Sequence, residues 1–352
     1  MKKENYLEFL EKTLDNYPVK NLKYLKKQVI DKNIAVEDQK QLNLGMDGII
    51  DISNLELKEQ IKKCLKRSQE AIKIFENWEF EKDYRYSVIF EINDFDYTWE
   101  QLDNKDYDEN ISENEIIEEN NFNKYKKIKI DDRIFLKFSL ALSGYHPQTG
   151  EEVLEKYVFI VIFHKEEKLV EFRFDTIGRN FEKDQINYPV LIEKMKTYLQ
   201  NFLDINLIPL DLNFLISIGK NQEELKLVAQ AMKLSNGGNA QLDVGNNQEY
   251  VLPLIGELKN LMVENKEELD KSPKLKEALE EFMYEKEEMS DYPWVELMWE
   301  DEIKTRNKRI KVFFNYKKLD YPLIQHYYNN VLIGMERMNY VIKYIAKNKK
   351  SS

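Results

Sequence analysis

The feature that most constrains the fold is a series of β-rich segments separated by short polar turns. Residues 86–92, 133–142, 156–164 and 169–174 are rich in β-branched and aromatic residues, as strands are. Segment 156–164 is an almost unbroken apolar run, which favours a central strand, and 165–168 has the polar composition of a hairpin turn. Because short turns join antiparallel neighbours, these segments predict an antiparallel β-meander.

Helical patterns flank the meander and predict an α+β fold. Apolar residues at helical spacing predict helices over 5–14, 22–30, 55–78, 189–203, 223–234, 254–264, 274–288, 294–304 and 322–347. Two further strands are expected at 213–218 and 309–315, and the Gly- and Asn-rich stretch 235–247 is typical of a linker. The predicted organisation is an N-terminal helical segment (1–80), an antiparallel-sheet α+β domain (81–234) with an acidic insertion at 93–122, and a helix-rich C-terminal region (248–352) with one basic strand.

A repeated pattern, Asp or Asn followed by Tyr and Pro, stands at 16–18, 187–189, 291–293 and 320–322. Asn and Asp cap free N–H groups, and Pro is tolerated in the first turn of a helix. The pattern therefore predicts a helix start at each of the four positions.

Composition excludes several classes of protein. Hydrophobic residues make up 42% of the 352 residues, and only 11 are Gly and 8 are Pro, so a disordered or linker-like chain is excluded. The sequence has no apolar run of about 18 residues, and its first residues lack an apolar signal core, which predicts neither a membrane span nor secretion. The single cysteine, Cys64, fits a reducing cytoplasm and is expected to be buried in a helix. Abundant Lys, Asn and Ile, which AT-rich codons favour, indicate a low-GC bacterial genome or a mobile element.

Negative charge is concentrated in one segment. The formal net charge is −11, and residues 91–120 alone contain twelve acids and one lysine, so the rest of the chain is formally neutral. We expect this segment to be a long, mobile and solvated insertion. An acidic mimic or a metal-binding loop is the alternative, although the central glycine of an EF-hand is absent.

Positive charge gathers around the predicted strand 309–315. Aromatic residues interleave with these bases, so phosphates could meet the cations while bases stack on the rings. The candidate nucleic-acid-binding residues are Lys304, Arg306, Lys308, Arg309, Lys311, Lys317 and Lys318. The alternative is a solvated face that is balanced by the acids at 296–302.

Recognisable catalytic motifs are missing from the sequence. Phosphate-binding glycine loops and the nucleophile elbow are absent, and the three histidines, His146, His164 and His326, have no metal-ligand spacing. We expect each histidine to lie in a turn or at the surface, and we predict no cofactor and no metal ligand.

The best case for an enzyme is a metal-dependent nuclease with carboxylates and a lysine near the sheet. Its candidate residues are Asp131, Asp132, Lys156, Glu171 and Asp175, and Glu166 and Lys168 have acid-x-Lys spacing within the predicted hairpin turn.

The preferred hypothesis is a non-catalytic, cytoplasmic binding or scaffold subunit of a bacterial multi-protein system. It would dock a protein partner and, as a second ligand, nucleic acid, with no membrane contact. Aromatic residues often anchor interfaces, so we expect Trp294, Met298 and Trp299, on one predicted helix, to form the protein interface. A defence or mobile-element system is the expected setting, and the nuclease is the alternative function.

Overall fold

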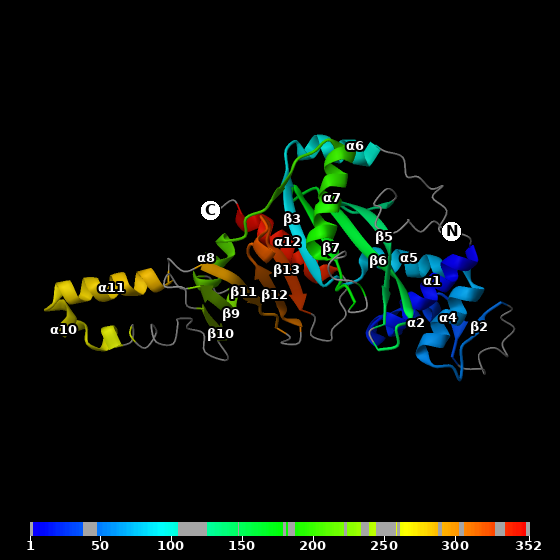
Figure 1. Ribbon diagram of the computed structural model, residues 1–352, viewed down its shortest axis with the longest axis horizontal. Coiled ribbons are helices and arrows are strands. Elements are labelled where there is room, and N and C mark those ends of the chain that lie inside the picture. Colours follow the sequence, from blue (N-terminus) through cyan, green and yellow to red (C-terminus); the bar gives the residue numbers. More distant parts are fainter. Residues whose placement is uncertain are drawn as a thin grey trace. The chain divides into compact units, whose positions relative to one another are not determined.

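The structure, a computed structural model, has an α+β fold in which antiparallel strands combine with helices (Figure 1). The residues that it describes are 3–37, 48–104, 125–146, 148–178, 181, 187–221, 224–233, 239–243, 258, 261–287, 291–302, 306–327 and 335–349. None of the described helices is long and apolar enough to cross a membrane.

The chain forms two compact units, and each combines segments that lie far apart in the sequence. Unit 1 comprises Met1–Arg85, Phe90–Ile208 and Leu332–Asn339, and unit 2 comprises Tyr86–Ile89, Pro209–Val331 and Tyr340–Ser352. The sequence suggested three consecutive segments, whereas both units here are built from discontinuous stretches.

Unit 1 contains the predicted meander and the N-terminal helices. Its elements are α1 (Lys3–Asn16), α2 (Val19–Asp31), β1 (Ala35–Val36), β2 (Ile50–Asp51), α4 (Leu57–Arg67), α5 (Gln69–Glu81), α6 (Phe95–Asn104), β4 (Lys126–Ile130), β5 (Arg133–Tyr145), β6 (Glu152–His164), β7 (Leu169–Phe174) and α7 (Tyr188–Leu203). Strands β4 to β7 pair antiparallel with their neighbours along the chain, which confirms the meander for 133–174. The strand β4 was not predicted, and the predicted first strand, 86–92, is next to β7 in the strand order instead of next to β5. The short strands β1 and β2 pair in parallel.

The two faces of the meander differ in chemistry. One face is apolar and packs against α7, where the rings of Phe138 and Tyr198 are 5.6 Å apart and those of Phe174 and Tyr188 are 5.5 Å apart. The opposite face carries Lys137 and Lys156, which are directed toward α5. Helix α1 also packs on β6, since the backbone N–H of Lys156 donates to Thr13 Oγ1. Helices α1, α2, α4 and α5 form a common apolar core.

Unit 2 contains a second antiparallel arrangement. Its elements are α8 (Phe214–Asn221), β9 (Lys226–Lys233), β10 (Asn239–Asp243), α10 (Lys266–Asp270), α11 (Pro273–Glu287), β11 (Asp291–Trp299), β12 (Lys308–Phe313), the 3₁₀ turn η2 (Tyr316–Lys318) and β13 (Leu323–Tyr327). Three further elements have residues in both units: β3 (Tyr86–Ile92), β8 (Leu207–Pro209) and α12 (Glu336–Asn348). The strand order is β10-β9-β11-β12-β13-β3. One face of these strands packs on α12, where Trp299 meets Tyr344 with ring centroids 5.2 Å apart.

Several predicted elements of the C-terminal half are wrong. The expected helices 223–234 and 294–304 are the strands β9 and β11, and the expected strand 213–218 is the helix α8. The predicted helix 322–347 contains the strand β13 and, further on, α12. Each of these strands pairs with a strand distant in the sequence, so tertiary pairing overrides the local helical pattern.

Other expectations are corrected only in part. The predicted helix 55–78 is broken at Ser68 into α4 and α5. The acidic insertion begins with the helix α6, which buries Phe95, Trp99 and Leu102, while 105–122 lies outside the described residues. Part of the predicted linker forms β10, which pairs with β9. Most of the predicted helix 254–264 lies outside the described residues.

The Tyr-Pro pattern starts a helix at two of its four positions. Asn187 caps α7 by accepting a hydrogen bond from the N–H of Val190, and Pro18 directly precedes α2. The other two prolines, Pro293 and Pro322, lie within β11 and just before β13. Pro fixes the backbone angle φ at a value that both helices and extended chains adopt. The pattern alone therefore does not distinguish a helix start from a strand.

Candidate nucleic-acid interface and charged clusters

Strands β11, β12 and β13 of unit 2 present a common face. In their register Met298 lies opposite Arg309, and Arg309 lies opposite Tyr327. Directly opposite residues of an antiparallel sheet share a face, so the rest of the face follows by alternation. We call the partly exposed side chains of this face, together with the buried Glu296, the open face. It consists of Tyr86, Trp294, Glu296, Met298, Arg309, Lys311, Phe313, Gln325 and Tyr327.

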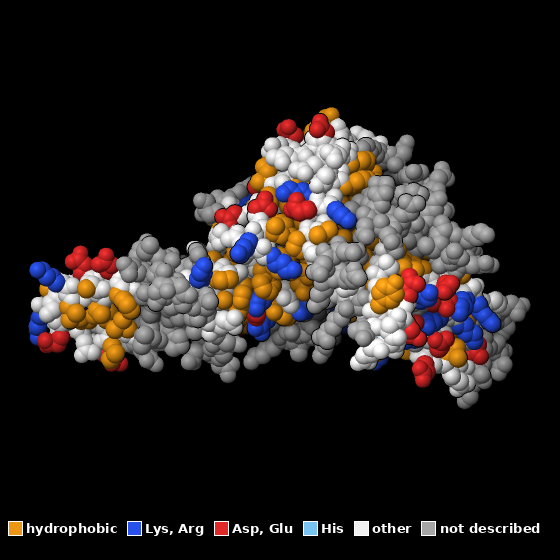
Figure 2. Space-filling model, viewed as in Figure 1, with side chains coloured by type: hydrophobic (Ala, Val, Ile, Leu, Met, Phe, Trp, Pro, Cys, Tyr) orange, Lys and Arg blue, Asp and Glu red, His pale blue; other side chains and the backbone are white. Residues whose placement is uncertain are grey.

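Cations and aromatic rings are interleaved on the open face. The Lys311 ammonium lies 3.3 Å from the ring centroid of Trp294 and 5.2 Å from that of Phe313. The Arg309 guanidinium lies 5.6 Å from the ring centroid of Tyr327. Figure 2 shows hydrophobic side chains with Lys and Arg among them over these strands. The face therefore offers planar rings and positive charge together.

Glu296 orients the two cations of the open face. Its carboxylate accepts hydrogen bonds from the Arg309 guanidinium, with the Arg309 Nε at 3.0 Å, and lies 3.5 Å from Lys311 Nζ. Two cations and one carboxylate leave a formal charge of +1 on the face. The carboxylate thus fixes the cations in place while it removes part of their charge.

The remaining candidate bases are distributed around β12. Lys308 lies on the opposite face of the strand, 4.2 Å from the ring centroid of Tyr340. Arg306 is exposed before the strand, and Lys317 and Lys318 are exposed in η2, directly after it. Lys304 lies outside the described residues. The structure therefore brings Arg309 and Lys311 together and places Lys317 and Lys318 at the following turn.

The helix that was expected to hold the predicted protein interface is a strand. Trp294, Met298 and Trp299 all lie on β11, where side chains alternate between faces. Trp294 and Met298 belong to the open face, whereas Trp299 is only 1% exposed and packs on the other side against Tyr340 and Tyr344. Trp299 is therefore a core residue.

Unit 1 contains a buried ion network that the sequence did not reveal. Glu76 and Glu79, one helical turn apart on α5, face Lys137 of β5 and Lys156 of β6. Lys137 Nζ lies 2.7 Å from Glu76 and 2.8 Å from Glu79, and Lys156 Nζ lies 2.6 Å and 2.7 Å from the same carboxylates. The Tyr6 hydroxyl also donates to Glu76.

Within the network the pKa shifts of Glu76 and Lys156 favour their charged forms, whereas burial lowers the pKa of the Lys137 ammonium group. Burial alone would raise the pKa of the Glu76 carboxyl, but the Lys137 and Lys156 ammonium groups outweigh burial, and the pKa lies well below its usual range. Burial opposes the charged form of Lys156, whereas Glu76 and Glu79 raise its pKa above the ordinary value. All four groups are buried, and their charges compensate one another inside the unit.

A second buried cluster lies on the same face of the meander. Glu171 accepts hydrogen bonds from Arg173, at 2.7 Å, and from His164 Nε2, at 3.0 Å. Burial would raise the pKa of the Glu171 carboxyl, but Arg173 and His164 lower it to about 2. The expectation that His164 lies in a turn or at the surface is wrong.

The other histidines and Cys64 divide between turn and core. His326 is buried in β13, with Nε2 2.8 Å from Ser87 Oγ, so the surface expectation is wrong for this residue too. His146 lies in the turn between β5 and β6, as predicted, and accepts a hydrogen bond from the Thr149 N–H. Burial of Cys64 is confirmed, and burial raises the pKa of its thiol to about 11.

Most residues of the nuclease hypothesis lie apart from one another, and only Asp132 and Glu166 of the candidates are brought together among the described residues. Lys156 belongs to the buried ion network, Glu171 pairs with Arg173, and Asp175 pairs with Lys82. Asp131 and Asp132 form the turn between β4 and β5. Lys168 pairs with Asp96 of α6, at 2.6 Å.

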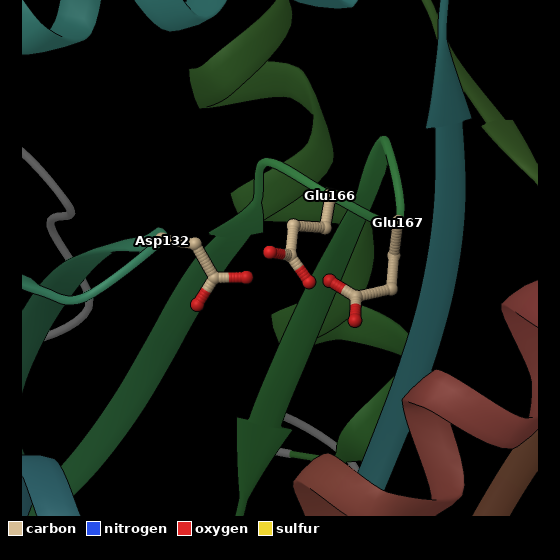
Figure 3. A group of neighbouring side chains, drawn as sticks. All are labelled: Asp132, Glu166 and Glu167. Carbon is tan, nitrogen blue, oxygen red and sulfur yellow. The ribbon is translucent and has the colours of Figure 1, made fainter.

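Asp132 instead meets two other acids, Glu166 and Glu167. These come from the turn between β6 and β7, and one carboxylate oxygen of each residue lies within 4.8 Å of the others (Figure 3). Oxygen donors at this spacing are the type that a hard divalent cation requires.

Comparison with known proteins gives no family for this chain. No protein-family model matches the sequence, and no curated protein matches it either.

Proposed function

We propose that the chain is a non-catalytic binding protein and that its open face binds single-stranded nucleic acid. The observation that carries the proposal is the interleaving of Trp294, Phe313 and Tyr327 with Arg309 and Lys311 on partly exposed strands. Aromatic platforms flanked by cations are a common way to hold single strands.

The geometry favours single strands over duplexes. Aromatic side chains stack on bases only where the faces of the bases are free, and a duplex stacks them internally. The positive charge that the described residues offer for phosphates is small, because Glu296 balances one cation and, in that part of the chain, Lys317 and Lys318 extend the patch. A duplex binder relies chiefly on phosphate contacts, so a face rich in rings and modest in charge is better suited to stacking.

Fluorescence anisotropy with labelled oligonucleotides of about 20 nucleotides tests the proposal. We expect the full chain to bind oligo-dT or oligo-U more tightly than a duplex of the same length. Replacing Phe313 or Tyr327 by Ala should weaken binding by about 5- to 150-fold, since one stacked base is worth about 1–3 kcal/mol. Lys311→Ala should weaken binding and reduce its salt dependence between about 50 and about 200 mM salt.

Matched controls separate stacking from a general effect. Tyr97 on α6 is an aromatic residue that is 63% exposed, and Lys12 on α1 is an exposed lysine paired with Glu8. Tyr97→Ala and Lys12→Ala should leave binding unchanged. Equal affinity of the wild type and the Phe313 and Tyr327 variants would exclude the open face as the binding site.

The same assay addresses the alternative function. A nuclease would shorten the labelled oligonucleotide when Mg²⁺ or Mn²⁺ is added, whereas the proposed binding protein leaves it intact. A protein partner, a cytoplasmic location and a bacterial defence or mobile-element setting remain predictions from the sequence.

A further inference from the structure

Three carboxylates converge where two hairpin turns of unit 1 meet. Arg133 at the start of β5 pairs with His164 at the end of β6, so the turns at either side are adjacent. The backbone N–H of Lys165 donates to the carbonyl oxygen of Asp132, at 3.0 Å, and fixes the turns to each other. Figure 3 shows the side chains of Asp132, Glu166 and Glu167 pointing toward one another from these turns.

One carboxylate oxygen of Glu167, Oε2, is buried and has no hydrogen-bond donor among the described residues. The Glu167 side chain is only 6% exposed. His164 Nδ1 lies 4.0 Å away, but it accepts a hydrogen bond from Arg133 Nε at 3.3 Å and therefore carries no proton for Glu167. The proton of the His164 ring is directed from Nε2 to Glu171 instead.

Asp132 also has a buried carboxylate oxygen that lacks a hydrogen-bond donor among the described residues. This atom is Oδ2, and the Arg133 guanidinium lies 3.6 Å from the other oxygen. Within the described ranges, the Arg133 guanidinium is the cation paired with this cluster, and it pairs with Asp132. An unpaired buried carboxylate costs several kcal/mol unless a positive ion or a donor compensates it.

We propose that Asp132, Glu166 and Glu167 form a binding site for a divalent cation of the Ca²⁺ type. Two ligand oxygens of one ion lie at most two metal–oxygen bond lengths apart, which is about 5 Å for Ca²⁺ and about 4 Å for Mg²⁺. The three carboxylate oxygens lie within 4.8 Å of one another, which is inside the limit for Ca²⁺, whereas Mg²⁺ would require them to lie closer. Glu166 is exposed, so water can complete the coordination shell. The site is independent of the nucleic-acid proposal, which concerns unit 2.

Isothermal titration of CaCl₂ into the EDTA-treated full chain tests the site. We expect Glu167→Gln and Glu166→Gln to weaken Ca²⁺ binding by about tenfold or more, because each removes a charged ligand. Glu8→Gln, which removes an exposed carboxylate on α1, is the matched control and should leave binding unchanged. Weak binding to acids elsewhere is common to all variants and cancels in the comparison.

Thermal unfolding supplies a readout that does not depend on titration. In EDTA, Glu167→Gln should unfold at the same temperature as the wild type or higher, since it removes a charge from an uncompensated cluster. Added Ca²⁺ should raise the unfolding temperature of the wild type more than that of the variant. Glu166→Gln keeps the test valid if Glu167→Gln fails to fold, because Glu166 is exposed.

Three results would overturn the proposal. Wild type and both Gln variants could bind Ca²⁺ equally, or the wild type could bind no Ca²⁺ at millimolar concentration. Tighter binding of Mg²⁺ than of Ca²⁺ would refute the assignment to a Ca²⁺-type ion.

Discussion

Lys137 and Lys156 place two ammonium groups inside unit 1, where isolated charges are strongly disfavoured. Each lysine contacts both Glu76 and Glu79, so the charges compensate one another through four short ion pairs. Such a network adds little net stability compared with an apolar core, but it is costly to break. Its geometry also allows only one position of α5 along the meander, because a shift by one residue would separate the pairs.

At the residue scale we predict that Lys137→Met destabilises the protein by about 3–5 kcal/mol, because it leaves two buried glutamates to share the single ammonium group of Lys156. Urea denaturation measures the effect. The double variant Lys137→Met/Glu79→Gln should recover part of the loss, and Lys12→Met, which removes an exposed ion pair, should cost at most about 1 kcal/mol. Equal stability of Lys137→Met and Lys12→Met would contradict the buried network.

At the scale of elements, a single polar residue sets where one helix ends and the next begins. Ser68 has an extended backbone between α4 and α5, and its hydroxyl accepts a hydrogen bond from the N–H of Ala71, at 3.2 Å. Its own N–H donates to the carbonyl oxygen of Cys64 and completes the preceding helix. The residue therefore ends one helix and starts the next, although the apolar stripe continues across it.

At the element scale we predict that Ser68→Ala lowers the free energy of unfolding by about 1 kcal/mol, because the first turn of α5 loses its cap. Chemical denaturation provides the measurement. Ser68→Asp, which keeps an acceptor at the cap, should retain most of the stability. A similar loss in both variants would show that the hydroxyl does not act as a cap.

The whole molecule is built from two units whose segments interleave along the chain. Unit 2 takes four residues, Tyr86–Ile89, from the N-terminal half, and Ser87 supplies the hydrogen-bond partner of His326. Unit 1 takes Leu332–Asn339 from the C-terminal part, and Asn339 accepts a hydrogen bond from Arg173 at 2.8 Å. Neither unit can be complete in a fragment cut between residues 208 and 209.

At this scale we predict that fragments 1–208 and 209–352 fold poorly when produced separately. Fragment 209–352 lacks the β3 residues that pair with β13, and fragment 1–208 lacks Asn339. Their yield as soluble protein and their thermal unfolding should improve when they are produced together. Cooperative unfolding of each isolated fragment at the temperature of the intact chain would contradict the interleaved organisation.

The candidate sites were predicted to different extents. The strand that contains Arg309 and Lys311 follows from its β-branched and basic residues, and the structure confirms it as β12. The partners of these residues, Trp294 and Tyr327, were expected on helices, so the open face could not be foreseen. Asp132 and Glu166 were named as candidate carboxylates of the nuclease hypothesis, but their proximity to each other and to Glu167 could not be predicted, since it depends on the register of β5 and β6.

The sequence by itself determined the meander, because alternating and continuous apolar strands joined by short turns have few other ways to bury their surface. It also determined α7 and the burial of Cys64. Only the tertiary structure decided that 291–299 and 226–233 are strands, because their hydrogen-bond partners lie far away in the chain and outweigh a weak local preference for helix. Likewise, only packing placed Lys137 and Lys156 against the glutamates of α5, since local periodicity cannot report which opposite charges meet in a core.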